Sequence, residues 1–223
     1  MITTIGTVNI DRSGALIRTN RPPESDLSDT VTVIWQDKRT ITPEQRRKAW
    51  ALIGEIAAAS GYRSGEREDV NRLLKAEFLR ARLDRLQADA IRAFSLSDID
   101  MTTARMYIDF LVEFCVENNV PTRVPLVEYA EDVEKYVYAC CTAKQCAVCG
   151  ARPADLHHWE RIGMGADRRE INHIGLRCEP LCRIHHNECH TMAQEDFDQL
   201  YHIEPVKIDE KIAKVYKLNR RNA

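Results

Sequence analysis

The first residues of the chain have the apolar and β-branched composition of strands. Residues 2–19 are interrupted at 11–14 by DRSG, a tetrad typical of a tight turn because its glycine tolerates left-handed geometry. Residues 30–35 (TVTVIW) are again rich in β-branched side chains, and the prolines at 22 and 23 place a loop between the two segments. We therefore expect a small antiparallel sheet at the N-terminal end, within residues 2–35.

Apolar residues then recur at helical spacing as far as residue 143. TPEQ at 42–45 supplies an N-cap hydroxyl, a proline where no N–H is needed and a glutamine able to complete a capping box, and Gly61 can end this helix. Cys140 and Cys141 are interpreted as packing residues, because neighbours on a helix diverge by about 100° and do not easily share one ion. Three more helices are expected, at 70–86, 100–118 and 126–143.

Composition and charge exclude several classes of protein. With 223 residues, 44% hydrophobic and 30% charged, the chain has the composition of an ordinary folded protein rather than of a fibrous or disordered one. No apolar run is long enough to span a membrane, and the segment from Met1 to Arg12 lacks a signal core, so we expect no membrane association and a cytoplasmic location. The formal charge of −2 gives no global positive field, so any polyanion site must be local.

Metal-binding residue types gather near the C-terminal end. Seven of the eight cysteines lie between 140 and 189, a clustering that indicates metal chemistry in a reducing compartment rather than disulfides. CAVCG at 146–150 is a CxxC knuckle, and CRIH at 182–185 repeats the spacing. Four N/S donors in two such pairs suit a structural zinc ion, and Cys178 competes for the fourth position. The predicted zinc ligands are Cys146, Cys149, Cys182 and His185.

More imidazoles are present than one zinc ion needs. His186 and His190 are one helical turn apart and share a face, so both can meet one ion, whereas His185 points about 100° away from them. His157 and His158 form a further pair after the knuckle. Two separate metal sites therefore fit on one short helix.

The run CAVCGARPADLHHWERIGMGADRREINHIGLRCEPLCRIHHNECH resembles the HNH endonucleases, specifically those found in phage recombination regions. Upstream, ITPEQRRKAWALIGEIAAASG and FSLSDIDMTTARMYIDFLVEFCVENNVP resemble the N-terminal half of the same phage proteins. That half also has a looser likeness to the Orf (NinB-type) recombination mediators. The location implied is the cytoplasm of a bacterial host.

The resemblance implies an α+β chain in three parts. Residues 1–145 would form a small antiparallel sheet plus helices, a DNA-binding or recombination-mediator-like domain. Residues 146–203 would form a zinc-stabilised ββα-metal (HNH) domain, and residues 204–223 a basic tail.

The same resemblance implies roles for the histidines. His157, His186 and His190 would bind a catalytic divalent ion, and His158 would be the general base. In the family, a middle asparagine holds the loop of the base histidine in place. It has no clean equivalent here, because Arg177 stands where it is commonly found; Asn172 and His173 are equal candidates for this supporting role at the catalytic site. Asp155 could replace a histidine as metal ligand or orient one.

Phosphodiester hydrolysis explains why these groups occur together. A neutral imidazole, with an unperturbed pKa near 6.5, is suited to take the proton of an attacking water at neutral pH. The crowded transition state needs positive charge, which a divalent cation with open coordination positions supplies. Mg²⁺, Mn²⁺, Ni²⁺ and Zn²⁺ all remain candidates.

Two basic segments are candidate phosphate contacts. The glycine-containing connection at 162–169 and its surroundings, and the lysines of the tail, can reach DNA phosphates, although an exposed charged loop and a frayed end explain the same residues. The predicted contacts are Arg161, Arg168, Arg169, Arg177, Lys211 and Lys214.

The sequence therefore predicts a metal-dependent HNH endonuclease acting in phage DNA recombination or processing. Its partner would be duplex or branched DNA or a recombination intermediate, with a second copy of the chain and other recombination proteins left open. One alternative is a non-catalytic, zinc-containing, DNA-binding recombination mediator. Another is an assembly module in which both histidine pairs hold zinc permanently. Imidazoles beyond a complete zinc set favour the enzyme.

Overall fold

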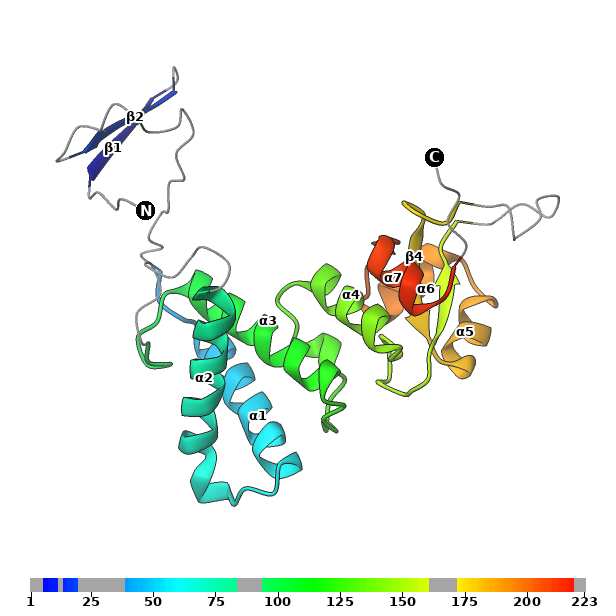
Figure 1. Ribbon diagram of the computed structural model, residues 1–223, viewed down its shortest axis with the longest axis horizontal. Coiled ribbons are helices and arrows are strands. Elements are labelled where there is room, and N and C mark those ends of the chain that lie inside the picture. Colours follow the sequence, from blue (N-terminus) through cyan, green and yellow to red (C-terminus); the bar gives the residue numbers. More distant parts are fainter. Residues whose placement is uncertain (1–5, 12–13, 20–38, 84–93, 161–171, 219–223) are drawn as a thin grey trace. The chain divides into compact units, whose positions relative to one another are not determined.

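The computed structural model describes residues 6–11, 14–19, 39–83, 94–160 and 172–218 (Figure 1). The chain divides into two compact units, Met1–Trp35 and Gln36–Ala223. The described residues contain seven α-helices and two small antiparallel sheets, which confirms the α+β class.

The first unit contains a β-hairpin. Strand β1 (Gly6–Asp11) pairs antiparallel with β2 (Gly14–Thr19), in register from Gly6 opposite Thr19 to Asp11 opposite Gly14. The hairpin confirms the sheet predicted around the DRSG turn. The strand expected at 30–35 lies outside the described residues.

The second unit begins with three helices of 17 residues each, which we call the helical region: α1 (Pro43–Ala59), α2 (Arg67–Leu83, after the short 3-10 helix η1, Ser64–Glu66) and α3 (Met101–Glu117). The capping box predicted at Thr42 is present, since its hydroxyl accepts the Gln45 N–H at 3.1 Å and the Gln45 side chain accepts the Thr42 N–H at 3.2 Å. Gly61 follows α1 with φ of +80°, the left-handed geometry expected of a helix-ending glycine.

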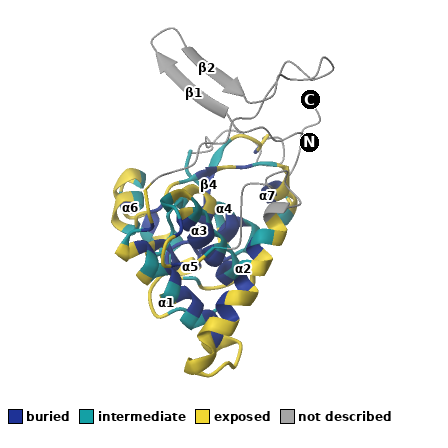
Figure 2. Cartoon of the chain, turned by 90° about the vertical axis from the view of Figure 1, so that its left-hand side faces the viewer, coloured by how far each residue is buried: buried dark blue, intermediate teal, exposed yellow. Residues whose placement is uncertain are grey.

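The helical region has a continuous apolar core. Leu52 and Ile53 of α1 are fully buried, as are Tyr107 and Leu111 of α3. Figure 2 shows the consequence, since the helices carry buried residues on one face and exposed residues on the other. Phe78 of α2 packs edge-on against Tyr107, with ring centroids 5.3 Å apart.

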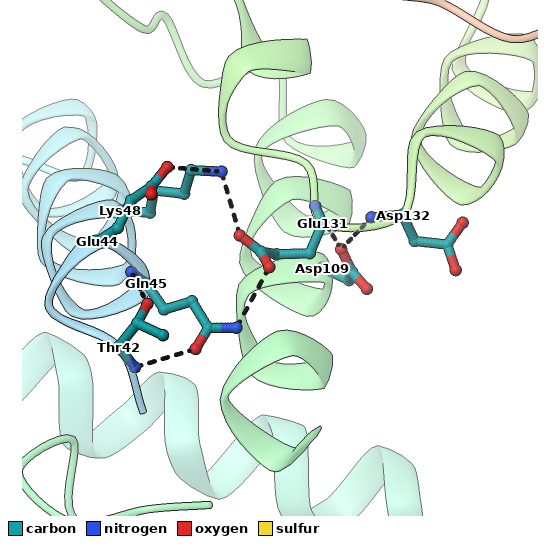
Figure 3. A network of polar contacts seen from close by, with 7 residues as sticks. All are labelled: Thr42, Glu44, Gln45, Lys48, Asp109, Glu131 and Asp132. Carbon is teal, nitrogen blue, oxygen red and sulfur yellow. Dashed lines mark hydrogen bonds and ion pairs between the residues drawn. The ribbon is translucent and has the colours of Figure 1, made fainter. Parts of the chain in front are cut away.

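The helix predicted at 126–143 is wrong in its first half. Residues Leu126–Glu128 form a 3-10 turn (η2), and the α-helix α4 covers only Val133–Ala143. The cause lies on α3, where one oxygen (Oδ1) of the buried Asp109 accepts the backbone N–H groups of Glu131 and Asp132, each at 3.0 Å (Figure 3). Asp132 then caps α4 by accepting the Lys135 N–H.

Residues 146–218 form what we call the metal region. Strands β3 (Asp155–His158), β4 (Arg177–Leu181) and β5 (Val206–Lys207) make an antiparallel sheet in that order. Helices α5 (Arg183–Cys189) and α6 (Gln194–Tyr201) lie between β4 and β5 in the chain, and α7 (Glu210–Val215) follows β5. The third strand was not predicted. Part of the predicted basic tail packs onto the rest of the region, because Ile208 and Ile212 are buried.

Helix α4 connects the two regions. It packs against β4 and α7, and the hydroxyl of its buried Tyr136 donates to the Ala147 carbonyl at 2.7 Å, inside the cysteine knuckle. Cys140 and Cys141 of this helix are buried, as expected of packing residues. No helix in the described part of the chain combines the length and apolar character that a membrane crossing needs.

Candidate metal centre

The cysteine knuckle is a tight turn that leads into the sheet. The Gly150 N–H donates to the Cys146 carbonyl at 2.9 Å, and Gly150 has φ of +73°, which favours glycine at this position. The Ala147 N–H donates to the Pro180 carbonyl of β4, so the turn is fixed to the strand that leads into α5. Cys182 is the N-cap of α5, and His185 lies in the first turn of that helix.

These elements bring four metal-ligating side chains together: Cys146, Cys149, Cys182 and His185, whose ligand atoms all lie within 4.8 Å of one another. The sulfurs of Cys149 and Cys182 are 3.8 Å apart, and Nδ1 of His185 lies 3.6 Å from the Cys146 sulfur. A tetrahedral zinc with Zn–S near 2.3 Å and Zn–N near 2.05 Å requires separations of about 3.8 and about 3.6 Å. The donor set therefore fits zinc, and Cys178, the competing candidate, is not in this group.

The protein environment shifts the pKa values of Cys182 and Cys146 in opposite directions. Burial opposes ionisation of Cys182, but hydrogen bonds from the backbone N–H groups of His185 and Ile184 outweigh it, so the pKa of this thiol is lowered. Burial raises the pKa of Cys146 to about 12. Because a thiol must lose its proton to bind zinc, metal binding here releases protons and depends on pH.

A second group combines imidazoles from a strand and a helix. His157 on β3, His186 on α5 and His190 at the end of α5 offer ligand atoms within 4.8 Å of one another, and we call them the histidine triad. Their ring centroids are 4.9 to 5.1 Å apart.

The histidine triad has the properties of a neutral ligand set. Nδ1 of His186 is buried and has no hydrogen-bond partner among the described residues, which is the condition of an atom suited to a metal ion. Burial lowers the pKa of His157, and burial together with the two neighbouring imidazoles lowers that of His186. The neutral form needed for metal binding is therefore favoured at neutral pH.

His158 pairs with a second histidine. Its Nε2 lies 2.9 Å from Nδ1 of the buried His173, which holds the ring from the connection between β3 and β4. Of the two equal candidates for the middle position of the motif, His173 is thus the one in contact with His158. Asn172 is exposed, and its side chain accepts the Ile174 N–H in a local turn.

Asp155 is not brought into either group. Its exposed carboxylate pairs with Arg183 at 3.1 Å, although its negative charge acts to raise the pKa of His186. Its predicted role as a ligand, or as a residue that orients one, stays a prediction.

A buried polar cluster beneath the triad was missed in the sequence. Glu179 of β4 stands directly opposite His157 in the sheet register, is fully buried and contacts Gln194 of α6. Burial, and then the charge of Asp198, raises the pKa of Glu179 to about 8. The only available signal was an acidic residue between Cys178 and Pro180 in a strand.

His157, Glu179 and Cys189 form a further set with ligand atoms within 4.8 Å, all three buried. This set uses the same imidazole as the triad. Cys189 lies between His186 and His190 on the chain, and burial raises the pKa of its thiol to about 11.

The predicted phosphate contacts have different surroundings. The Arg177 guanidinium stacks over the Trp159 ring at 3.5 Å and pairs with Glu160 at 2.7 Å. Lys211 and Lys214 are exposed on α7 and line a shallow hollow. Arg161, Arg168 and Arg169 lie outside the described residues.

Strands β3 and β4 and helix α5 thus form a ββα unit that presents three histidines to a common point beside a four-ligand zinc set. This arrangement is the one expected of a ββα metal-binding protein. A family model described as "Putative HNHc nuclease" matches residues 18–219. The chain belongs to this HNH nuclease family. Comparisons with curated proteins and with solved structures each give no match.

Proposed function

We propose that this protein is a metal-dependent HNH endonuclease that hydrolyses phosphodiester bonds in DNA. The observation that carries the proposal is the convergence of His157, His186 and His190 on one point, separate from a complete zinc set. A structural module needs only the zinc set. The triad adds three ligands and, in a site of higher coordination number, leaves positions for substrate and water.

The residues divide the work between them. The triad would hold a divalent ion, and such an ion would supply positive charge to the phosphate and the leaving oxygen in the transition state. His158 takes the proton of the attacking water, and His173 orients its ring through the Nε2 to Nδ1 contact of 2.9 Å. The resemblance to the HNH endonucleases implies that cleavage would leave a 5′-phosphate and a 3′-hydroxyl.

The zinc set has a structural part in the proposal. Cys146 and Cys149 belong to the knuckle, while Cys182 and His185 belong to the start of α5. Zinc bound there fixes α5 against the knuckle, and α5 carries two of the three triad histidines. The zinc ion therefore positions the catalytic ligands without taking part in the reaction.

The DNA surface is proposed from charge. Lys211 and Lys214 on α7, with the arginines between β3 and β4, would contact phosphates on either side of the bond that is cut. The resemblance to phage recombination proteins suggests duplex, branched or recombination-intermediate DNA as substrate, in a bacterial host cytoplasm, with self-association and other recombination proteins as further partners. Binding through a few charges should weaken steeply as salt increases.

One assay tests the proposal. Supercoiled plasmid and branched DNA are incubated with the full chain and Mg²⁺, Mn²⁺, Ni²⁺ or Zn²⁺, beside His158→Ala and beside His202→Asn, a matched control at an exposed histidine on α6's C-cap. Loss of a general base typically costs about 10²–10⁴-fold in rate. We expect a loss of that size in His158→Ala and none in His202→Asn.

The outcomes separate the alternatives. Equal cleavage by wild type and His158→Ala removes His158 as the base. Absence of cleavage with every metal, combined with retained DNA binding in a gel-shift assay, favours the recombination mediator. Zinc content measured on each variant verifies that the structural site is intact.

A further inference from the structure

The ligand His157 is held by a side chain that no motif includes. Oε1 of Gln194, the first residue of α6, lies 2.8 Å from Nε2 of His157. The same oxygen lies 3.3 Å from the sulfur of Cys189, which can donate its S–H. The Gln194 oxygen therefore faces two groups that can donate hydrogen bonds.

The nitrogen of the same amide faces the opposite kind of group. Nε2 of Gln194 donates to the Glu179 carboxyl at 2.7 Å and to the Asp198 carboxyl at 3.2 Å. Asp198 is itself held by the Trp159 indole N–H at 2.8 Å. Exchanging the places of the amide oxygen and nitrogen would point the oxygen at the carboxyl oxygens of Glu179 and Asp198, and the nitrogen at His157 and the Cys189 thiol. The two carboxyl groups therefore favour the orientation described.

The orientation of the amide sets the hydrogen on the imidazole. A neutral histidine carries one hydrogen, and the nitrogen that faces an amide oxygen must be the one that carries it. In metal sites the ligating histidine commonly donates its second N–H to an oxygen in this way, which fixes the tautomer and the ring orientation.

We propose that Gln194 is a positioning residue that keeps hydrogen on Nε2 of His157, so that Nδ1 is the atom presented to the catalytic ion, with Glu179 and Asp198 holding the amide in place. The inference rests on the proposed function, since it concerns the same ion. It also explains why a glutamate is fully buried opposite His157 in the sheet: its carboxyl anchors the amide that orients the ligand.

The rival arrangement is an ion bound in the set of His157, Glu179 and Cys189. That ion would need Nε2 of His157 as its ligand, because Nε2 is the nitrogen 3.5 Å from the Cys189 sulfur. Gln194 would then have to leave its place. The two arrangements require opposite tautomers of His157, so they are distinguishable.

The first measurement needs no substitution. Long-range proton–nitrogen NMR spectra of the full chain, labelled with ¹⁵N-histidine and carrying zinc in the cysteine site, report which nitrogen of His157 is protonated. We expect hydrogen on Nε2. Hydrogen on Nδ1 overturns the inference and favours the rival set.

The second measurement uses Gln194→Met, which keeps the side-chain length and removes the hydrogen-bonding groups. Loss of such a partner typically weakens metal binding about 10–100-fold. We expect a loss of this size in the titration of Mn²⁺ or Ni²⁺ followed by calorimetry. Gln199→Met, at an exposed position on the same helix, should bind as wild type does.

The outcomes of the titration distinguish this inference from the proposed function. If Gln194→Met binds the metal ion within twofold of the wild-type affinity and its thermal stability is unchanged, the inference is overturned. The proposed nuclease function is not affected by this result. Weaker metal binding in Cys189→Ala but not in Gln194→Met supports the rival set and also overturns the inference about Gln194. A wild-type chain that binds no second ion removes the proposed metal site itself, and the inference with it.

Discussion

The helical region and the metal region of this protein reach a folded state by different means. Helices α1, α2 and α3 have 17 residues each and share an apolar core, whereas α5, α6 and α7 have only seven, eight and six. Helices this short are not stable alone, and β3, β4 and β5 have four, five and two residues. From this difference we expect the metal region to depend on a bound metal ion more than the helical region does.

Removal of a zinc ligand should change the relative stability of the two regions most. Structural zinc contributes on the order of 10 kcal/mol in small domains, so Cys146→Ser is expected to unfold the metal region. Amide hydrogen exchange should show lost protection in α5, α6 and α7, and retained protection in α1 and α3. Cys115→Ala, at a buried non-ligand cysteine of α3, should keep its zinc. Equal loss of protection in both regions would contradict the comparison.

In the helical region, the buried side chain of Asp109 fixes the chain that leads into α4. Asp109→Ala leaves two backbone N–H groups, of Glu131 and Asp132, without their acceptor, and each such loss costs about 1–3 kcal/mol. Burial raises the pKa of Asp109, a cost that the substitution removes, so we expect a net loss of about 2 kcal/mol. Chemical denaturation measures it.

Asp98→Ala, at an exposed position before α3, is the control for this prediction and should lie within about 0.5 kcal/mol of wild type. If Asp109→Ala is equally mild, the connection between α3 and α4 is held by packing alone.

Glu179 should make the stability of the metal region decrease as pH rises. Its pKa in the folded state, about 8, lies above the value of about 4.3 expected when unfolded, so the folded state binds an extra proton between these values. The free energy of unfolding should therefore fall as pH rises from about 4.3 to about 8. Glu179→Gln removes this dependence.

The measurement is the melting temperature of both proteins from pH 5 to 8.5, with zinc bound throughout. The difference in favour of Glu179→Gln should grow with pH. Glu195→Gln, an exposed position on α6, should show no such trend. A constant difference across the range would mean that Glu179 is already ionised at the lowest pH.

The smallest expected effect concerns the cap of α1. Thr42→Ala removes the hydroxyl that accepts the Gln45 N–H, a change that costs about 1 kcal/mol. Denaturation midpoints should show this loss for Thr42→Ala and a few tenths at most for Thr42→Ser. A full-sized loss in the serine variant would assign the effect to the methyl group instead of the cap.

Local signals were predictable from the sequence, and distant ones were not. The start of α1 and the hairpin follow from a cap and a turn within a few residues, and the approximate limits of α3 follow from the helical spacing of its apolar residues. The start of α4 was missed because Asp109, which lies on the preceding helix α3, withdraws two backbone N–H groups from a helix. Strand β5 was missed because its pairing with β4 depends on the folded sheet rather than on its two residues.

The candidate site shows the same division. The zinc set and the histidine pairs are visible as spacings, because their ligands come in short segments. Gln194 and Asp198 belong to an ordinary amphipathic helix, and only the folded sheet shows that the amide of Gln194 faces His157. Residues that orient a ligand do not occur at a characteristic spacing in the sequence, so no motif reveals them.

Strand β5 has a practical consequence for work on this protein. It covers the outer edge of β4 at Arg177 and Cys178, and the following Ile208 and Ile212 are buried. A fragment that stops at residue 203 would leave that edge unpaired and uncover an apolar patch, a combination that promotes aggregation. Any expression fragment of the metal region should therefore extend to residue 218.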